Sequence, residues 1–385
     1  MVNHPAHLRL VRQLLDQDGA RSRDVAVGEV SSDRYTSHDR FLRERAMIFS
    51  RTPLVVATEA EVGQPGSCLP VEVAGVSLLL VRGQDGSLNA FRNACRHRST
   101  ELVSGDAPCV KKAIVCRYHG WTYDLAGRLT HVPHEPAFDG KPSERGGLVK
   151  AHVVVRHGLV WASLSPFEIE AHLGGIDEEL AALAGSGLTL YRRSTRVVQA
   201  NWKLIIDAFL DGYHIRHLHK ETVYRFFLDA RFQAERAGCH IRAVTARRAL
   251  QEVGPPVGGA DLRNVVTPSY LVFPHTTLVL HPDYTSVLTA TPLAADSTRF
   301  VHWMLLERQP TSDAERDHYT KSFELIDEGV FGREDLAVAE AMQRGLTTGA
   351  NPSILFGALE YPALWFHQTV DEVSCSPAAR SSVES

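Results

Sequence analysis

The sequence predicts an α+β protein that contains a small antiparallel β domain. Its 385 residues are enough for two or three hydrophobic cores, at roughly 100–200 residues per domain. From about Pro53 to Ser165, short apolar runs alternate with glycine-containing turns, which is typical of antiparallel strands. The second half combines a strand-rich segment, 269–307, with segments of helical periodicity.

Individual elements follow from apolar spacing and from turn dipeptides. Helices are expected near the N-terminus, where apolar residues share one face, and at four later segments: 168–184, 201–218, 312–329 and 334–345. Strands are expected at 71–73, 76–82, 88–92, 122–125 and 128–132, and in the second half at 269–272, 276–280, 286–292 and 299–307. The serine-rich tail from Ser374 is expected to be disordered.

Composition and charge exclude several classes of function. The chain has 41 basic and 45 acidic residues and a formal net charge of -4, so it offers no broad basic surface for nucleic acid and no polybasic patch for a membrane. Its longest apolar runs, such as 76–81, are too short to cross a bilayer. The N-terminus lacks the apolar core of a signal peptide. Six cysteines form no disulfide framework, which favours a reducing, cytoplasmic setting.

Two short motifs in the β region carry metal-ligand chemistry. Cys95 and His97 form a C-x-H motif, and Cys116 and His119 form a C-x-x-H motif, with 18 residues between the two motifs. Zinc sites usually draw on C-x2-4-C and H-x3-5-H pairs. Here each pair mixes one cysteine with one histidine, which suits a Rieske 2Fe-2S cluster, where one iron takes both cysteines and the other both histidines. Zinc and a chance grouping of four residues are the alternatives.

A second cluster of polar residues lies in the helical pattern of residues 201–221. Asp207, Asp211 and His214 are spaced i, i+4 and i+7 and would share one face of a helix. Two histidines and one carboxylate form the facial triad of non-haem Fe(II) oxygenases. The second histidine could be His217 or His219, and a solvated polar helix face is the alternative.

The two motifs of the β region resemble a known family. CRHRSTEL at 95–102 and CRYHGWTYDLAGRL at 116–129 are similar to the Rieske segment of the alpha subunits of Rieske non-haem iron oxygenases, the ring-hydroxylating and demethylating family. Respiratory Rieske proteins carry a further cysteine in each loop, where this chain has Thr100 and Tyr118. The resemblance implies a Rieske-type antiparallel β domain, inserted in a helix-grip catalytic domain whose antiparallel sheet surrounds a long helix. The expected limits are 46–165 for the Rieske 2Fe-2S domain, 1–45 and 166–373 for the catalytic domain, and 374–385 for the tail.

The resemblance also assigns the second cluster. The family pattern is an acid, two residues, a histidine, four residues and a histidine, which DGYHIRHLH matches with Asp211, His214 and His219. It implies that His214 and His219 bind the mononuclear Fe(II), and that Asp211 bridges to an iron-ligating histidine. The i+5 spacing of the ligands then requires a π-type bulge or a helix end between them. Many relatives have Asn where this chain has Ala208.

The third iron ligand is expected from a later helix. GREDLAVAEAMQRGL at 332–346 is similar to the family helix that begins with an acidic pair. The resemblance indicates Asp335 as the ligand, with Glu334 as the fallback. An acid stabilised at a helix start by the macrodipole is the alternative.

The resemblance implies a terminal oxygenase that passes electrons from the Rieske cluster to Fe(II) and inserts oxygen from O2 into a small organic substrate. The chain has no ferredoxin, flavin or nicotinamide motif, so an external NAD(P)H-dependent reductase must supply electrons, directly or through a ferredoxin. In the family, transfer crosses a subunit interface of a homotrimer, from His119 to the partner subunit's Asp211 and then to its iron ligand.

Several functions remain possible, both within the oxygenase family and outside it. Hydroxylation or oxidative demethylation is favoured over cis-dihydroxylation by an aromatic-ring dioxygenase of aromatic hydrocarbon catabolism. A Rieske electron carrier without oxygenase activity and a zinc-bound interaction protein are remote alternatives. The candidate pocket residues are Phe226, Phe227, Phe273, Leu355, Phe356, Tyr361 and Phe366.

Overall fold

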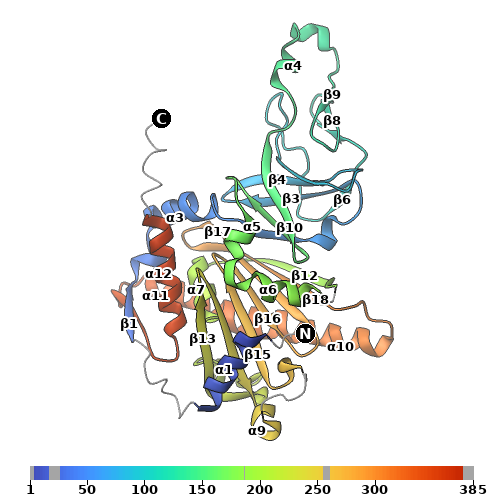
Figure 1. Ribbon diagram of the computed structural model, residues 1–385. Helices are drawn as coiled ribbons and strands as arrows, with labels where there is room; N and C mark the ends of the chain where they lie inside the picture. The colour runs from blue at the N-terminus through green and yellow to red at the C-terminus, as the bar shows by residue number, and fades with distance from the viewer. Residues whose placement is uncertain (1–3, 17–26, 186, 255–260, 376–385) are drawn as a thin grey trace. The chain divides into compact units, whose positions relative to one another are not determined.

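The computed structural model describes residues 4–16, 27–185, 187–254 and 261–375, and Figure 1 draws their arrangement. The chain divides into two compact units. The smaller unit is Phe49–His172, and the larger unit joins Met1–Ile48 to Leu173–Ser385. The corresponding Rieske domain is expected from the sequence to span residues 46–165. Within the described ranges, no helix has the length and hydropathy needed to cross a membrane.

Two antiparallel sheets form the smaller unit, as the sequence predicts. One sheet has seven strands in the order β2-β11-β10-β5-β4-β3-β6, and the other has three in the order β7-β8-β9. The strands are β2 Leu54–Thr58, β3 Ser67–Val73, β4 Val76–Arg82, β5 Leu88–Arg92, β6 Cys109–Val110, β7 Ile114–Val115, β8 Thr122–Tyr123, β9 Leu129–His131, β10 Lys150–Arg156 and β11 Leu159–Ser163. The short helical segments are η2 Glu59–Val62, η3 Glu135–Phe138, α4 Lys141–Arg145 and α5 Ile169–Leu173.

The predicted turn between β3 and β4 closes a tight hairpin. Val73 pairs with Val76, and both turn residues have positive φ, 53° at Ala74 and 79° at Gly75. Two-residue turns of this kind match the right-handed twist of paired strands. The hairpin therefore follows from local sequence.

Aromatic side chains form much of the core of the smaller unit. Phe91, Trp121 and Tyr123 are at most 2% exposed, and Cys95 and Cys116 belong to the same buried cluster. The two loops that carry the predicted cluster ligands are therefore held on a packed core, which favours a single arrangement of their side chains.

A seven-stranded antiparallel sheet forms the centre of the larger unit. Its strand order is β12-β18-β17-β16-β15-β14-β13 (Figure 1). The strands are β12 Thr189–Val198, β13 Phe227–Ala237, β14 His240–Arg247, β15 Val266–Val272, β16 Thr276–Leu280, β17 Thr285–Ala294 and β18 Ser297–Leu306. The four strands predicted in the second half are confirmed as β15 to β18.

Helices complete the larger unit. The N-terminal helix α1 (Pro5–Asp16) is confirmed, and it packs its apolar face on β13 and β14 (Figure 1). The other short elements are β1 Gly28–Ser31, which pairs with β19 Ser353–Phe356, and α2 Asp33–Thr36, α3 His38–Glu44, η1 Arg45–Phe49, η4 Gly174–Ile176, α6 Asp177–Ala184, η5 Tyr224–Phe226, α9 Ala249–Val253 and η6 Leu262–Asn264. The C-terminal helix α12 (Tyr361–Cys375) includes Ser374, so the predicted start of the disordered tail is wrong. The rest of that tail, 376–385, lies outside the described residues.

The long helix predicted around the second cluster is wrong as a single element. α7 (Trp202–Ala208) ends, and the one-turn α8 (Ile215–Leu218) begins after an irregular segment. Asp211 stabilises this break, because its Oδ1 accepts the backbone N–H groups of Tyr213 at 2.7 Å and His214 at 3.1 Å. A side chain that accepts backbone N–H groups in this way competes with continuation of the helix.

One continuous helical segment carries the late acidic pair. α10 (Asp313–Phe323) leads through the π-helical η7 (Glu324–Leu336) into α11 (Ala337–Leu346). The interruption predicted between 329 and 334 is therefore absent. The wider turns of a π-helix rotate side chains relative to a regular α-helix and are common at functional sites. Asp335 lies at the end of this π-helical segment.

Candidate metal centres

Two similar loops carry the four predicted cluster ligands. In each loop the cysteine carbonyl accepts the backbone N–H of the residue four positions later, at 2.9 Å in both. Cys95 and Cys116 are each 3% exposed, whereas His97 is half-buried and His119 is exposed. Each loop therefore presents its thiol toward the core and its imidazole toward the surface.

The side chains of the two loops converge. The ring centroids of His97 and His119 lie 4.7 Å apart. The Tyr123 oxygen accepts the backbone N–H of Arg96 at 2.9 Å and lies 3.3 Å from Cys95 Sγ. The tyrosine hydroxyl can therefore donate its proton to that sulfur, which stabilises a thiolate.

This donor set fits a 2Fe-2S cluster with two cysteine and two histidine ligands. Nδ1 of His97 is buried and has no hydrogen-bond partner in the part of the chain that the structure describes. A buried polar atom without a partner requires an explanation, and binding of an ion is one of the accepted ones. Burial raises the pKa of the Cys95 thiol, so a bound metal rather than solvent would hold it as a thiolate.

The second centre lies in the larger unit and consists of His214, His219 and Asp335. Asp335 Oδ1 lies 3.2 Å from His219 Nε2 and 4.0 Å from His214 Nε2. One ligand atom from each residue lies within 4.8 Å of the other two. A first-row metal held about 2.0–2.2 Å from each donor fits between atoms at these separations.

Each histidine of this centre donates its other ring proton to a carboxylate. His214 Nδ1 lies 2.8 Å from Asp211 Oδ1, and His219 Nδ1 lies 2.7 Å from Glu334 Oε2. A carboxylate on Nδ1 selects the tautomer whose Nε2 can bind a metal. Asp335 Oδ1 is buried and has no hydrogen-bond partner among the described residues. Burial of such an oxygen is costly without a cation, so the three residues fit an iron ion.

The remaining acids of the predicted cluster lie elsewhere. Asp207 accepts the Tyr35 hydroxyl at 2.8 Å and lies 3.2 Å from His367 Nε2, so it belongs to a buried polar network. Glu334, the fallback ligand, bonds to His219 on the nitrogen that does not face Asp335.

The one-turn helix α8 explains the unusual spacing of the histidines. His214 is its N-cap residue and His219 is its C-cap residue, so the two lie at opposite ends of a single turn. This is the helix end predicted between the ligands. His217, on the same turn, is exposed.

Acids around the histidines favour positive charge at this centre. Burial opposes protonation of His214, but the Asp211 carboxylate, with smaller effects of Asp335 and Glu360, raises its pKa to about 9. Burial also opposes protonation of His219, and Asp335 again outweighs it and raises the pKa. The same carboxylates would stabilise a bound metal cation, with both histidines unprotonated at the nitrogen that binds it.

Comparisons with known proteins match two family models to this chain. Residues 52–151 match the Rieske 2Fe-2S domain family, and residues 185–374 match the ring hydroxylating alpha subunit family, catalytic domain. A carnitine monooxygenase oxygenase subunit of Acinetobacter baumannii is 27% identical over 325 residues, which are 81% of this chain and 83% of that protein. Together the two matches describe a Rieske domain followed by the catalytic domain of a ring-hydroxylating alpha subunit.

The chain belongs to the alpha subunits of the Rieske non-haem iron oxygenases. It is an oxidoreductase with a Rieske 2Fe-2S cluster and a mononuclear iron, and it inserts oxygen from O2 into a small substrate. The chlorobenzene dioxygenase alpha subunit of a Cupriavidus species is 31% identical over 200 residues, 50% of this chain and 44% of that protein. The fold matches a solved quaternary ammonium Rieske monooxygenase in complex with L-carnitine, with a TM-score of 0.78, 24% identity, and coverage of 92% of this chain and 97% of that one.

A cavity of about 320 Å³ adjoins the iron centre of this Rieske oxygenase. His214, His219 and Asp335 line it, together with the aromatic residues Phe209, Phe226, Phe227, Tyr284 and Phe331. The volume suits a small organic molecule. Ala208 also lines the cavity, so no amide occupies the place where many relatives have Asn.

The predicted pocket residues are only partly correct. Phe226 and Phe227 line the cavity, whereas the other five candidates do not. Phe273, Tyr361 and Phe366 are at most 5% exposed and pack in the core, and Leu355 is 62% exposed. Phe356 lines a second cavity instead. An aromatic residue in a sequence does not reveal which side of a sheet it faces until the strand is placed.

Polar residues on strands β14 and β15, and one residue just after β16, line the cavity but are absent from the predicted site. They are Thr245, Arg247, Thr267, Ser269 and His281. Strand alternation places residues at alternate positions on the same face of a sheet, so the sequence could have grouped these polar residues. No local pattern tells which face of the sheet is turned toward the iron.

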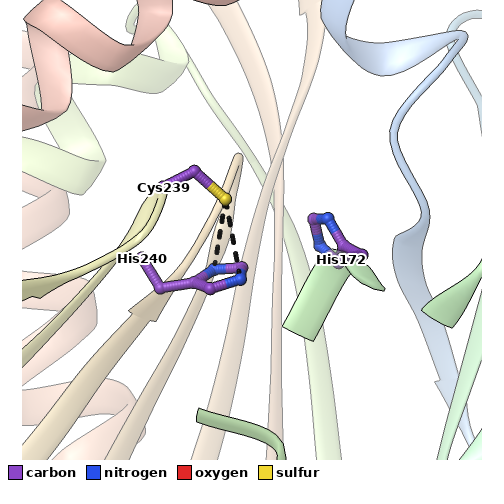
Figure 2. Close-up of side chains that lie close together, drawn as sticks. All are labelled: His172, Cys239 and His240. Atoms are coloured by element: carbon purple, nitrogen blue, oxygen red, sulfur yellow. Dashed lines mark hydrogen bonds between the residues drawn. The ribbon is translucent and has the colours of Figure 1, made fainter. Parts of the chain in front are cut away.

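Cys239 and His240 form a further pair of potential metal ligands in the larger unit. Figure 2 shows the Cys239 sulfur beside the His240 ring, 3.6 Å from Nε2. His240 Nδ1 accepts the backbone N–H of Phe273 at 3.0 Å. These contacts indicate a structural role for the pair at the start of β14.

Proposed function

We propose that this chain is the terminal component of a cytoplasmic monooxygenase system that hydroxylates or oxidatively demethylates a small organic substrate. An external NAD(P)H-dependent reductase, acting directly or through a ferredoxin, supplies the electrons. The observation that carries this proposal is that His214, His219 and Asp335 face one cavity of about 320 Å³, where a substrate and O2 can meet.

The residues have distinct roles in this proposal. Cys95, His97, Cys116 and His119 hold the cluster, and two histidines and Asp335 hold the iron through Nε2 and Oδ1. The cluster supplies single electrons, and the iron supplies reduction of O2. Asp211 and Glu334 keep the two iron-binding imidazoles in the required tautomer, which the distances of 2.8 and 2.7 Å at Nδ1 support.

We further propose that Asp211 bridges the electron-transfer route from the Rieske cluster of a neighbouring subunit of a homotrimer to His214. Asp211, His214 and Asp335 line a second cavity of about 210 Å³ as well as the first. Exposed apolar side chains occur around this second cavity or next to it in sequence: Tyr213, Val338, Met342 and Leu355. Exposed apolar residues gathered in this way are typical of an interface, which supports subunit contact beside Asp211.

Mono-oxygenation is favoured over cis-dihydroxylation by the chemistry of the cavity wall. Hydroxyl groups of Thr245, Thr267 and Ser269 and the guanidinium of Arg247 line it, and such polar groups suit a polar substrate better than an aromatic hydrocarbon. The carnitine monooxygenase oxygenase subunit also matches over more of this chain than the chlorobenzene dioxygenase alpha subunit does. Cis-dihydroxylation, as in aromatic hydrocarbon catabolism, is the second candidate.

Oxygen uptake with a Rieske-oxygenase reductase tests the proposal. Aromatic acids, quaternary amines and methyl ethers form the substrate panel, and labelled O2 counts the oxygen atoms that enter the product. One labelled oxygen in a hydroxylated product, or release of formaldehyde from a methyl-bearing substrate, supports mono-oxygenation, and two labelled oxygens in a cis-diol support the second candidate. A cluster that is reduced but drives no oxygen uptake with any member of the panel would indicate an electron carrier.

A further inference from the structure

One arginine stands out on the wall of the substrate cavity. Arg247 ends β14 and lines the cavity together with Thr245, two positions earlier on the same face of the strand. Antiparallel pairing sets Thr245 opposite Thr267, and both threonines line the same cavity as Arg247. Arg247 is the only arginine or lysine among the described residues that line this cavity.

The guanidinium has few partners of its own. Its only side-chain hydrogen bond within the described ranges runs from Nη1 to Thr267 Oγ1, at 3.3 Å. The Phe226 and Phe227 ring centroids each lie 5.6 Å from its central carbon. An arginine has five N–H donors in a planar fork, so most of its donors have no acceptor from the described residues.

No carboxylate in the described part of the chain forms an ion pair with Arg247. Asp283 is the acid whose charge acts on it, but Asp283 Oδ2 lies 2.6 Å from His318 Nε2 and is bound there. Burial lowers the pKa of Arg247, which indicates a partly desolvated cation. A desolvated charge without a counter-ion is costly, and aromatic faces offset only part of that cost.

His281, a further basic group of this wall, does not add positive charge. His281 lines the cavity and stacks on Tyr284, with ring centroids 4.1 Å apart. Burial lowers the pKa of His281 to about 3, so its ring is neutral at physiological pH. A ligand therefore meets one permanent cation, set among hydroxyl groups and aromatic rings.

We propose that Arg247 binds a carboxylate of the substrate, so that the substrate class of this oxygenase is small organic acids or zwitterions rather than neutral molecules. The inference rests on the proposed function, since it concerns the substrate of that same site. Two parallel N–H groups of a guanidinium match the two oxygens of a carboxylate, and Thr267 can donate a further hydrogen bond. With its carboxylate bound at Arg247, the rest of the substrate can extend along the cavity, which the iron ligands also line.

Two kinds of substrate carry this group. An aromatic carboxylic acid would place its ring among the phenylalanines, and a betaine such as carnitine would place a quaternary ammonium there, where aromatic faces also favour a cation. The shared chemistry is the carboxylate, and the experiment separates the two sources.

The test is anaerobic binding to the iron-loaded, cluster-containing enzyme, measured by titration calorimetry with matched acid and amide pairs. The probes are 4-methoxybenzoate and its amide, benzoate and benzamide, and glycine betaine and its amide. In the wild type, at least one acid should bind tenfold or more tightly than its amide. In Arg247→Gln, binding of that acid should weaken by about 10- to 150-fold, the range for a lost hydrogen bond to a charged group, while binding of the amide changes little.

Two further variants make the result specific. Arg248→Gln is the matched control, because Arg248 is exposed, donates to the Arg225 carbonyl at 3.0 Å and does not line the cavity. It should keep the preference for the acid. Arg247→Lys keeps the charge but loses the planar fork, so it should restore part of the preference.

Clear outcomes would overturn the proposal. It fails if no pair shows a preference for the acid in the wild type, or if that preference persists in Arg247→Gln. A merely structural role would lower the stability of Arg247→Gln without changing the ratio of acid to amide affinity. Acid binding through Arg247 without oxygen uptake would support this anchor and count against the proposed function, whereas oxygen uptake with neutral substrates alone would overturn only the anchor.

Discussion

Replacing Asp211 by asparagine should separate iron binding from electron delivery. Asp211 Oδ1 accepts the backbone N–H groups of Tyr213 and His214 and the ring proton at His214 Nδ1, at 2.7, 3.1 and 2.8 Å. An asparagine carbonyl can accept the same three protons, so the turn should persist. Only the negative charge beside the imidazole is lost, and neither metal loses a direct ligand.

The expected magnitude follows from these contacts. A hydrogen bond to a charged partner contributes about 1.5–3 kcal/mol and a neutral one about 0.5–1.5 kcal/mol, so the change costs roughly 1–1.5 kcal/mol, or about five- to tenfold. Loss of a carboxylate behind a metal-binding histidine lowers metal affinity or activity by about 10–100-fold. Product formation should therefore fall by at least about fivefold and by up to about 100-fold, while the iron content stays near that of wild type when Fe(II) is supplied in excess.

A single-turnover experiment measures this effect directly. Reduced enzyme is mixed with substrate and O2, and cluster reoxidation is followed by its visible absorbance. In Asp211→Asn the cluster should stay mostly reduced. Glu334→Gln is the matched control, because Glu334 makes the same contact to His219 at 2.7 Å; it should weaken the iron site but leave cluster reoxidation coupled to product. Rapid reoxidation with full product yield in Asp211→Asn would refute the assigned role of Asp211.

Three further predictions concern the metals and the core. Cys116→Ser should abolish the visible cluster absorbance and multiple turnover while most of the fold is retained; a normal spectrum would contradict the cluster assignment. His219→Ala should lower the iron content of the second centre without changing the Rieske spectrum, whereas His217→Ala should do neither, because His217 is exposed; metal analysis with the reverse pattern would return the ligand role to His217. Glu44→Ala should lower the free energy of unfolding by about 3–5 kcal/mol, because it leaves a buried charge unpaired: Lys203 is 0% exposed and its Nζ lies 2.6 Å from Glu44 Oε2. Denaturant unfolding measures this change, and a loss below about 1 kcal/mol would show that the ion pair is not needed.

The cluster loops could be predicted from the sequence because their geometry is local. Each cysteine lies two or three residues from its histidine, inside a turn closed by the cysteine's own carbonyl. Side chains so close along the chain converge whenever the turn forms. The strands around the loops could also be predicted, because glycine-containing turns such as Ala74-Gly75 separate the short apolar runs.

The iron centre could be predicted only in part. On a regular helix His214 and His219 point about 140° apart, so periodicity alone does not choose between His217 and His219, and only the family resemblance indicates His219. The structure resolves this by ending α7 at Ala208 and setting the two histidines at the ends of one short turn. The break between α7 and α8 depends on the side chain of Asp211 and on packing. The periodicity of apolar residues in the sequence contains no information on either.

The sequence by itself determined the type of protein, namely its two ligand motifs, its antiparallel strands and its family. Only the tertiary structure decided which residues face the substrate. Asp335 reaches the histidines from a π-helical segment more than a hundred residues later, and Arg247 reaches the same cavity from the end of β14. The physical reason is that long-range strand pairing and helix packing choose the face and the partner of each side chain, whereas local patterns specify only its period.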